Sequence, residues 1–115
     1  MDYDLKDRTR EFALRVIRLC SALPRGRTST IVSRQLVRAG TSPGAHFREA
    51  LHARSKAEYV TKMNVGLMEL EETLYWLEIV EGAVLMKPPK LTALQQEARE
   101  LIAIFISLIN KWRSK

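Results

Sequence analysis

Apolar residues recur every three, four or seven positions in four stretches of the chain, which is the period of a helix that buries one face. The spacing predicts helices over residues 4–23, from residue 28 or 29 to about 53, over 55–85 and over 91–112. No stretch has the strict alternation of a half-buried strand. The chain is therefore predicted to be all-α.

Helix boundaries are indicated by capping residues and helix breakers. Thr28 or Ser29 is the expected N-cap of the second helix. Ser55 with Glu58 three positions later has the form of a capping box for the third. Pro88 and Pro89 are expected to interrupt regular structure before the fourth.

The stretch "TSPG" is the ambiguous part of the second helix. Pro43 clashes with the carbonyl of Ala39, four residues back, and this favours a break. The spacing of His46, Glu49 and Ala53 nevertheless continues the helical period, and this favours a kinked but unbroken helix. If the helix breaks, Ser42 caps a new one and Pro43 takes its first position. Both alternatives remain open from the sequence.

The fourth predicted helix has apolar residues on two faces. Its main seam alternates three- and four-residue steps and consists of Leu91, Leu94, Ala98, Leu101, Phe105, Leu108 and Trp112. A second stripe consists of Ile102, Ile106 and Ile109. One face of a helix suffices to pack inside a four-helix bundle, so the second face predicts another partner.

Short connections between long helices favour antiparallel neighbours. The expected architecture is a single domain, residues 1–115, folded as an antiparallel up-down-up-down four-helix bundle. No apolar run is long enough to cross a membrane, and the charged N-terminus shows no signal peptide. The single cysteine, Cys20, cannot form an internal disulfide, and we expect it to be a small core residue. These features predict a cytoplasmic protein.

Charge is distributed unevenly along the chain, whose formal net charge is +6. Residues 1–62 carry 13 Lys and Arg against 6 Asp and Glu, whereas residues 63–100 carry 3 against 7. The predicted nucleic-acid-binding residues are Arg8, Arg15, Arg18, Arg25, Arg27, Arg34 and Arg38. The tail adds Lys111, Arg113 and Lys115. These arginines either bind phosphate, or form a solvated face, or pair with the acidic third helix of a neighbouring copy.

A second set of polar residues shares helix faces: Ser42, His46 and Glu49 on the second helix, and Glu69 and Glu72 on the third. We expect a structural polar layer here, with Arg34 or Arg38 as partner to the carboxylates. The segment "EALH" matches half of a di-iron signature, but that site needs the motif on two helices. We therefore predict no metal, no cofactor, no catalytic residue and no enzyme activity.

The segment "SRQLVRAGTSPGAHFREA", followed by "SKAEYVTKMNVGLMELEETLYWLEIV", resembles a known family of small bacterial four-helix bundle proteins. That family is named for members encoded in intervening sequences of large-subunit ribosomal RNA genes. The chain is also similar to the accessory protein of diversity-generating retroelements, which partners a reverse transcriptase. The resemblance implies a ring-like homopentamer without established catalytic activity. For the retroelement relatives it also implies binding of nucleic acid and of the polymerase through a basic surface. Where the family commonly has Asn, this chain has His46.

Two functions remain open. The first is a non-enzymatic homo-oligomeric adaptor that binds RNA or DNA through its basic surface, together with a nucleic-acid-processing enzyme. The second is a structural or protein-interaction module that binds no nucleic acid. Opposite charge on two parts of one chain favours head-to-tail contacts that close into a ring. Only the resemblance supplies the number five.

Overall fold

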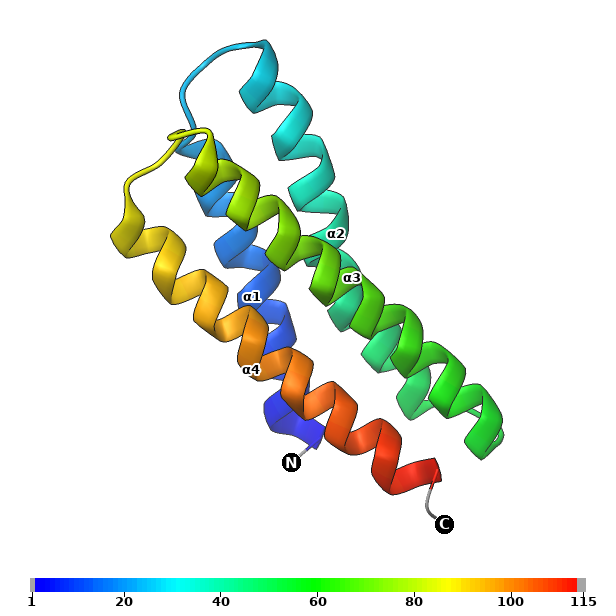
Figure 1. Ribbon diagram of the computed structural model, residues 1–115. Coiled ribbons are helices and arrows are strands. Elements are labelled where there is room, and N and C mark those ends of the chain that lie inside the picture. Colours follow the sequence, from blue (N-terminus) through cyan, green and yellow to red (C-terminus); the bar gives the residue numbers. More distant parts are fainter. Residues whose placement is uncertain (1, 114–115) are drawn as a thin grey trace.

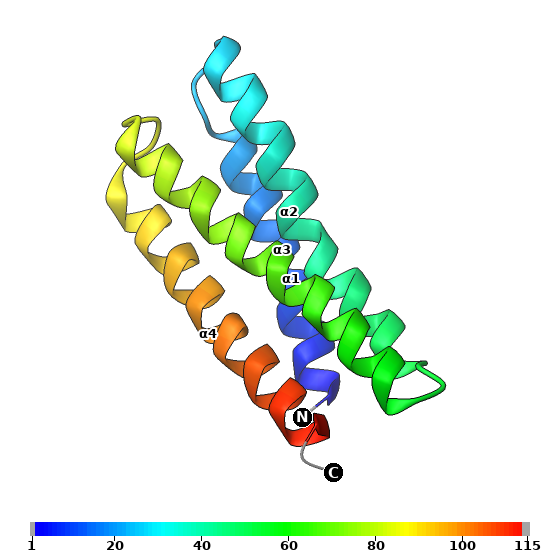
Figure 2. The same cartoon turned by 45° about the vertical axis from the view of Figure 1, so that its right-hand side comes forward.

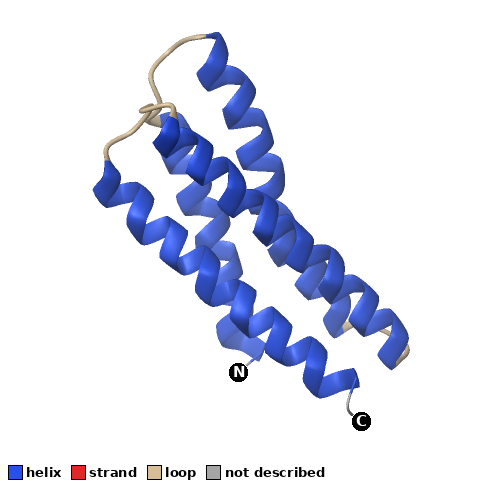
Figure 3. Cartoon of the chain, in the orientation of Figure 1, coloured by secondary structure: helices blue, strands red, loops and turns tan. Residues whose placement is uncertain are grey.

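A computed structural model describes residues 2–113, and among them every regular element is an α-helix (Figure 3). The side chains of residues 2 and 3 and the tail residue Lys115 lie outside the part that is described. The four helices are α1 Asp2–Ser21, α2 Arg27–Leu51, α3 Lys56–Gly82 and α4 Pro88–Arg113. The prediction of an all-α chain with four helices packed together is confirmed.

The helices lie along the length of a molecule that measures 47 × 21 × 20 Å. The α1–α2 and α3–α4 connections lie at one end, and the α2–α3 connection lies at the other, near the C-terminal end of α4 (Figures 1 and 2). Consecutive helices pack closely along their lengths, whereas α1 and α4 make the least contact of the neighbouring pairs. No helix in the described part of the chain is long and apolar enough to cross a membrane.

The core takes apolar side chains from all four helices. Its largest fully buried side chains include Phe12 of α1, Phe47 of α2 and Phe105 of α4. The rings of Phe47 and Phe105 lie 6.2 Å apart. Because the buried positions on each helix follow the helical period, the pattern that predicted the helices also identified most of the core.

α2 continues through Pro43 without a break, so the alternative of a new helix at Ser42 is wrong. The two hydroxyls just before Pro43 donate to backbone carbonyls one turn back and do not cap a new helix. Thr41 donates to the Val37 carbonyl at 2.7 Å, and Ser42 donates to the Arg38 carbonyl at 2.7 Å. Such bonds from Ser and Thr to the previous turn are compatible with a helix that bends without ending.

Two glycines hold α2 close to α1. A Cβ atom on Gly40 would lie 2.8 and 2.9 Å from the two methyl carbons of Val16, and one on Gly44 would lie 3.1 Å from the hydroxyl of Thr9. Thr9 is buried and donates its hydroxyl hydrogen to the Leu5 carbonyl at 2.8 Å. The small residues of the ambiguous stretch therefore create a tight α1–α2 contact, and this contact holds the proline-containing turn in the helix.

The ends of α2 and α3 differ in how they are capped. α2 begins at Arg27, with Gly26 as N-cap, so the predicted caps Thr28 and Ser29 lie inside the helix. Gly26 has a φ of 153°, and its carbonyl accepts from both the amide and the hydroxyl of Thr30. For α3 the predicted N-cap is confirmed, because the Ser55 side chain accepts from the Glu58 amide at 3.1 Å.

α3 ends at Gly82, three residues before the predicted end. The amide of Leu85 bonds to the Val80 carbonyl, and that of Val84 to the Glu81 carbonyl, both at 3.0 Å. This is a Schellman motif, in which the residue after the C-cap takes a left-handed conformation. Val84 occupies that position with a φ of 56°, although β-branched residues rarely adopt it.

We expect Val84→Gly to raise the free energy of unfolding by about 1 kcal/mol, because glycine has no Cβ to clash in the left-handed region. Val84 is 84% exposed, so its removal costs no core contact. The measurement is chemical denaturation beside Val84→Ala, which keeps the Cβ atom. Equal stability of the Gly and Ala variants would contradict the explanation.

α4 begins at Pro88, three residues before the predicted start. Proline is tolerated here because the first amides of a helix have no partner within the helix. The predicted seam is correct through Phe105, but then the buried position is Ile109, whereas Leu108 and Trp112 are half-buried. A helix with 3.6 residues per turn drifts relative to a seven-residue repeat, and this drift accounts for the shift. In α3, Thr73 is fully buried, whereas the adjacent Leu74 is half-buried.

Candidate functional site

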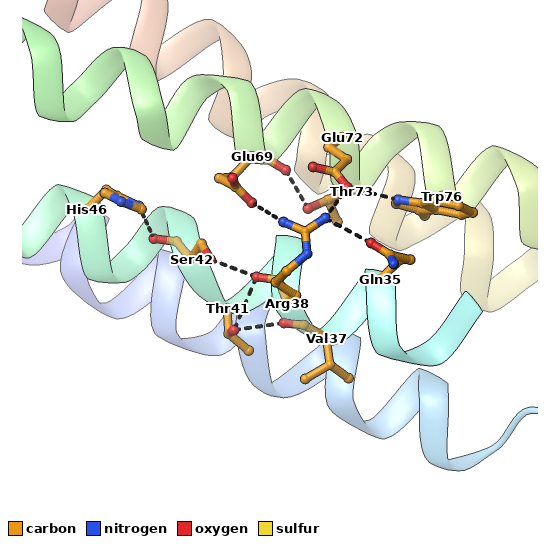
Figure 4. Close-up of polar contacts among 10 residues, drawn as sticks. All are labelled: Gln35, Val37, Arg38, Thr41, Ser42, His46, Glu69, Glu72, Thr73 and Trp76. Atoms are coloured by element: carbon orange, nitrogen blue, oxygen red, sulfur yellow. Dashed lines mark hydrogen bonds and ion pairs between the residues drawn. The ribbon is translucent and has the colours of Figure 1, made fainter. Parts of the chain in front are cut away.

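Arg38 of α2 is the centre of a polar group that connects α2 to α3 (Figure 4). Its guanidinium donates to Glu69 at 3.2 Å, to Gln35 at 3.0 Å and to Glu72. The Glu72 carboxylate also accepts from the indole of Trp76 at 3.1 Å. Side-chain exposure is 49% for Arg38 and 20% for Glu69, so the group lies at the edge of the helix pair. Arg38 is thus committed to two carboxylates of its own chain.

Ser42 and His46 bond within α2 rather than across to α3 (Figure 4). The Ser42 hydroxyl donates to the Arg38 carbonyl, and the His46 Nδ1 atom lies 3.0 Å from the Ser42 carbonyl. Of the five residues assigned to a polar layer, the structure joins Glu69 and Glu72 through Arg38. It places Ser42 and His46 one and two turns further along α2.

Glu49 belongs to a separate, exposed ion pair with Lys62 of α3 at 2.9 Å. The hydrogen bond from Lys62 and its positive charge hold the pKa of Glu49 below its usual value. The same contact raises the pKa of Lys62. Both side chains are open to solvent, where an ion pair contributes little to stability.

The two carboxylates should therefore respond differently to removal. We expect Glu72→Ala to lower the free energy of unfolding by about 1 kcal/mol, because the Trp76 indole loses its acceptor and Arg38 loses one of its two anions. Glu49→Ala is the matched control and should melt within error of the wild type. The measurement is thermal unfolding of both variants. A destabilised Glu49→Ala beside a stable Glu72→Ala would contradict this assignment.

Arg8 of α1 forms an ion pair with Glu97 of α4. It donates two hydrogen bonds to Glu97, at 2.7 and 3.1 Å, and one to Glu100 at 3.2 Å. These bonds raise the pKa of Arg8. The Glu97 side chain is only 17% exposed, so it lies between the helices rather than in open solvent. A planar guanidinium matches the two oxygens of a carboxylate, and this pair connects the two neighbouring helices that otherwise make the least contact.

The other five arginines of the predicted binding set lie near the end of the molecule that holds the α1–α2 connection (Figure 1). Arg18 pairs with Glu11 at 3.1 Å, and both side chains are more than half exposed. Among the side chains described, those of residues 4–113, no carboxylate pairs with the remaining four, which are Arg15, Arg25, Arg27 and Arg34. Within that range the seven predicted residues divide into three that are paired and four that are not.

Two hollows at this end are each lined by two arginines of the predicted binding set. The first, of about 440 Å³, lies between α1 and α4, with Arg15, Arg18 and Lys90 around apolar residues. The second, of about 350 Å³, includes Arg25 and Arg34 beside the α1–α2 turn. No carboxylate lines either hollow, so both present a positive surface to solvent.

Cys20 and the aromatic pair Tyr75 and Trp76 show no arrangement beyond ordinary packing. The Cys20 thiol is half-buried against the core, 3.9 Å from the Ser33 carbonyl, and burial raises its pKa. Trp76 packs against the core, whereas Tyr75 is 53% exposed. Nowhere in the described part of the chain do three His, Cys, Asp or Glu side chains come together as a set of metal ligands.

The sequence reasoning missed a hollow of about 490 Å³ at the opposite end, where α2 meets α3 beside the last turn of α4. Its lining includes the rings of Tyr59 and Trp112, whose centroids are 4.6 Å apart at an angle of 30°. Arg54, Lys56 and Lys111 also line it. Trp112 was assigned to the core seam, and the basic residues come from two distant parts of the sequence. The basic tail was the one available signal.

Comparison with known proteins gives a consistent family assignment. The chain is similar to a crystal structure of a protein of unknown function from the S23 ribosomal protein family of Bacteroides thetaiotaomicron. The two share 34% sequence identity over 95% of this chain and 97% of that one, with a TM-score of 0.88. A comparison with curated proteins gave no match. The model of the 23S rRNA-intervening sequence protein family matches residues 1–107. The chain therefore belongs to the 23S rRNA-intervening sequence protein family.

Proposed function

We propose that this protein is a non-enzymatic homo-oligomer that binds nucleic acid through phosphate contacts. The observation that carries the proposal is the division of the arginines. Arg8 and Arg38 are occupied by carboxylates of the same chain, whereas Arg15, Arg25, Arg27 and Arg34 are left without one in the described residues. Arginine is suited to phosphate because its planar donors match two phosphate oxygens.

The arginines at the positive end come from α1, from α2 and from the connection between them. They surround that connection and two open hollows, an arrangement suited to phosphate contacts from several elements. Binding is therefore expected to depend on charge and to vary little with sequence. Several copies of this end in one assembly multiply a modest affinity.

The subunit is proposed to be an antiparallel up-down-up-down bundle that closes into a ring, with five copies as the resemblance implies. Support comes from the outward face of α3, where Met68 is 66% and Tyr75 53% exposed. Exposed Glu71 and Glu78 lie on the same helix, three residues after Met68 and Tyr75. An apolar face with acidic flanks fits a basic, partly apolar surface on another copy.

That same α3 face favours the second candidate function, a module that only assembles. In that case Glu71 and Glu78 of one copy pair with Arg15 and Lys90 of the next, and no arginine remains for phosphate. The adaptor role, with a nucleic-acid-processing enzyme as partner in the cytoplasm, belongs to the first candidate alone.

A binding titration at several salt concentrations, run beside a sizing column, separates the two functions. The probe is a 20-base-pair DNA duplex of mixed sequence, with a second duplex of different sequence and equal length. We expect an oligomer on the column, similar affinity for both duplexes, and affinity that falls steeply with salt. An assembled protein that binds neither duplex at low salt would overturn nucleic-acid binding. A monomer at micromolar concentration would overturn the assembly.

A further inference from the structure

The hollow at the α2–α3 end combines aromatic rings with positive charge. The Tyr59 and Trp112 rings pack against each other at an angle of 30°, and Tyr59 is buried, so Trp112 is the outer member of the pair. Trp112 is half-buried and also lines a second hollow, of about 430 Å³, beside Val60 and Arg113. Trp112 therefore lines two hollows at this end of the molecule.

The charges that line this hollow are all positive. Arg54 follows the end of α2, and Lys111 lies in the last turn of α4, one residue before Trp112. Neither forms an ion pair with a described residue. No Asp or Glu contributes to the lining, and Leu51 and Leu108 complete its apolar part. The site therefore offers a flat π surface and an anion-binding rim within one hollow.

We propose that this hollow binds a nucleotide, with the base stacked on Trp112 and the phosphate held by Arg54 and Lys111. Every base has a π face, so stacking on an aromatic side chain tolerates any sequence. The volume lies within the range of small-molecule sites. In a duplex the bases are already stacked on one another, so the site selects a free mononucleotide or an unpaired nucleotide of a single strand.

This inference rests on the proposed function only where the ligand is a nucleotide of a single-stranded nucleic acid; binding of a free mononucleotide is independent of it. The arginines proposed to contact duplex phosphates lie at the other end of the 47 Å molecule. The two sites therefore predict different ligands, duplex at one end and unpaired nucleotide at the other, and they can fail separately.

The test uses the intrinsic fluorescence of the full chain, which has two tryptophans. The probes are adenosine monophosphate, ribose 5-phosphate, adenosine, a ten-nucleotide single strand and a duplex of the same length. We expect the monophosphate and the single strand to quench fluorescence, and ribose 5-phosphate and adenosine to bind at least tenfold more weakly. The duplex should leave the signal unchanged.

Variants assign the signal to the site. Both Trp112 variants remove the reporting fluorophore, so their binding is measured by isothermal titration calorimetry. Trp112→Leu should bind the monophosphate no more tightly than ribose 5-phosphate, whereas Trp112→Phe, which keeps a ring against Tyr59, should retain tenfold tighter binding of the monophosphate. Lys111→Gln and Arg54→Gln should each weaken monophosphate binding about tenfold, and both residues are exposed, so the fold is not at risk. Lys87→Gln, at the opposite end, removes the same charge and should have no effect.

Several outcomes would overturn the inference. One is equal quenching by adenosine monophosphate and ribose 5-phosphate, since the base would then contribute nothing. Another is an acidic peptide that quenches as strongly as the nucleotide, which would assign the hollow to a protein partner. Duplex binding without a response to the monophosphate leaves the proposed function standing and removes this site. Quenching by the monophosphate without any duplex binding supports this site and removes the proposed function.

Discussion

Gly40→Ala is expected to lower the free energy of unfolding by about 1–3 kcal/mol, which is large for the addition of one methyl group to a helix. In an open helix this substitution stabilises, because alanine has the higher helix propensity. Here the added Cβ would lie 2.8–3.0 Å from three carbon atoms of Val16, which is fully buried on α1. Either the two helices separate or Val16 is displaced, and both disturb a close-packed core.

The matched control is Gly82→Ala at the end of α3. A Cβ atom there would meet nothing within 4 Å, and Gly82 does not have a positive φ. The substitution should therefore be neutral or stabilise by up to about 1 kcal/mol. Chemical denaturation of both variants measures the difference.

A double-mutant cycle with Val16→Ala identifies the atoms responsible. Val16→Ala removes the two methyl carbons nearest to the new Cβ, so it should cost less in the Gly40→Ala background than in the wild type. A coupling of about 1 kcal/mol is expected. Strict additivity of the two substitutions would show that the α1–α2 contact is not the cause.

Replacing Arg15, Arg27 and Arg34 together with Gln should weaken duplex binding by roughly 10²–10³-fold near 0.1 M salt. Each phosphate neutralised on duplex DNA contributes about −0.9 to the log–log salt slope, so losing three makes the slope shallower by about 2 to 3. The loss should be equal for every duplex sequence, because phosphate contacts carry no sequence information. The measurement is a filter-binding titration at four or more salt concentrations.

The control variant replaces Arg10, Arg48 and Arg99 with Gln. These arginines are exposed and belong to neither proposed site. Their replacement removes the same net charge from elsewhere on the surface. If both triple variants lose affinity equally, the binding follows total charge and the α1–α2 end is not a site. If the first variant fails to assemble on a sizing column, its arginines serve subunit contacts, as the second candidate function requires.

The four helices could be predicted from the chain alone, because a period of 3.6 residues in apolar positions is visible without knowing what covers them. The α3 N-cap at Ser55 was equally predictable, since the bond from the Glu58 amide to the Ser55 side chain lies within four residues of the chain. Boundaries that depend on local backbone strain were displaced by a few residues, as at Pro88, which lies within α4 rather than before it.

The path of the second helix past Pro43 depends on its contacts with α1. Local chemistry left a break and a kink nearly balanced, and the close approach of Gly40 and Gly44 to α1 favours continuity. The partners of the arginines were decided in the same way. The seven are alike in sequence, but Arg8 meets Glu97, 89 positions away, and Arg38 meets Glu69 and Glu72, whereas Arg34 meets no carboxylate among the described residues. Helix period sets which side of a helix a charge occupies, but the carboxylate it reaches depends on how neighbouring helices are rotated and shifted along one another, and that is set by core packing between residues far apart in the chain.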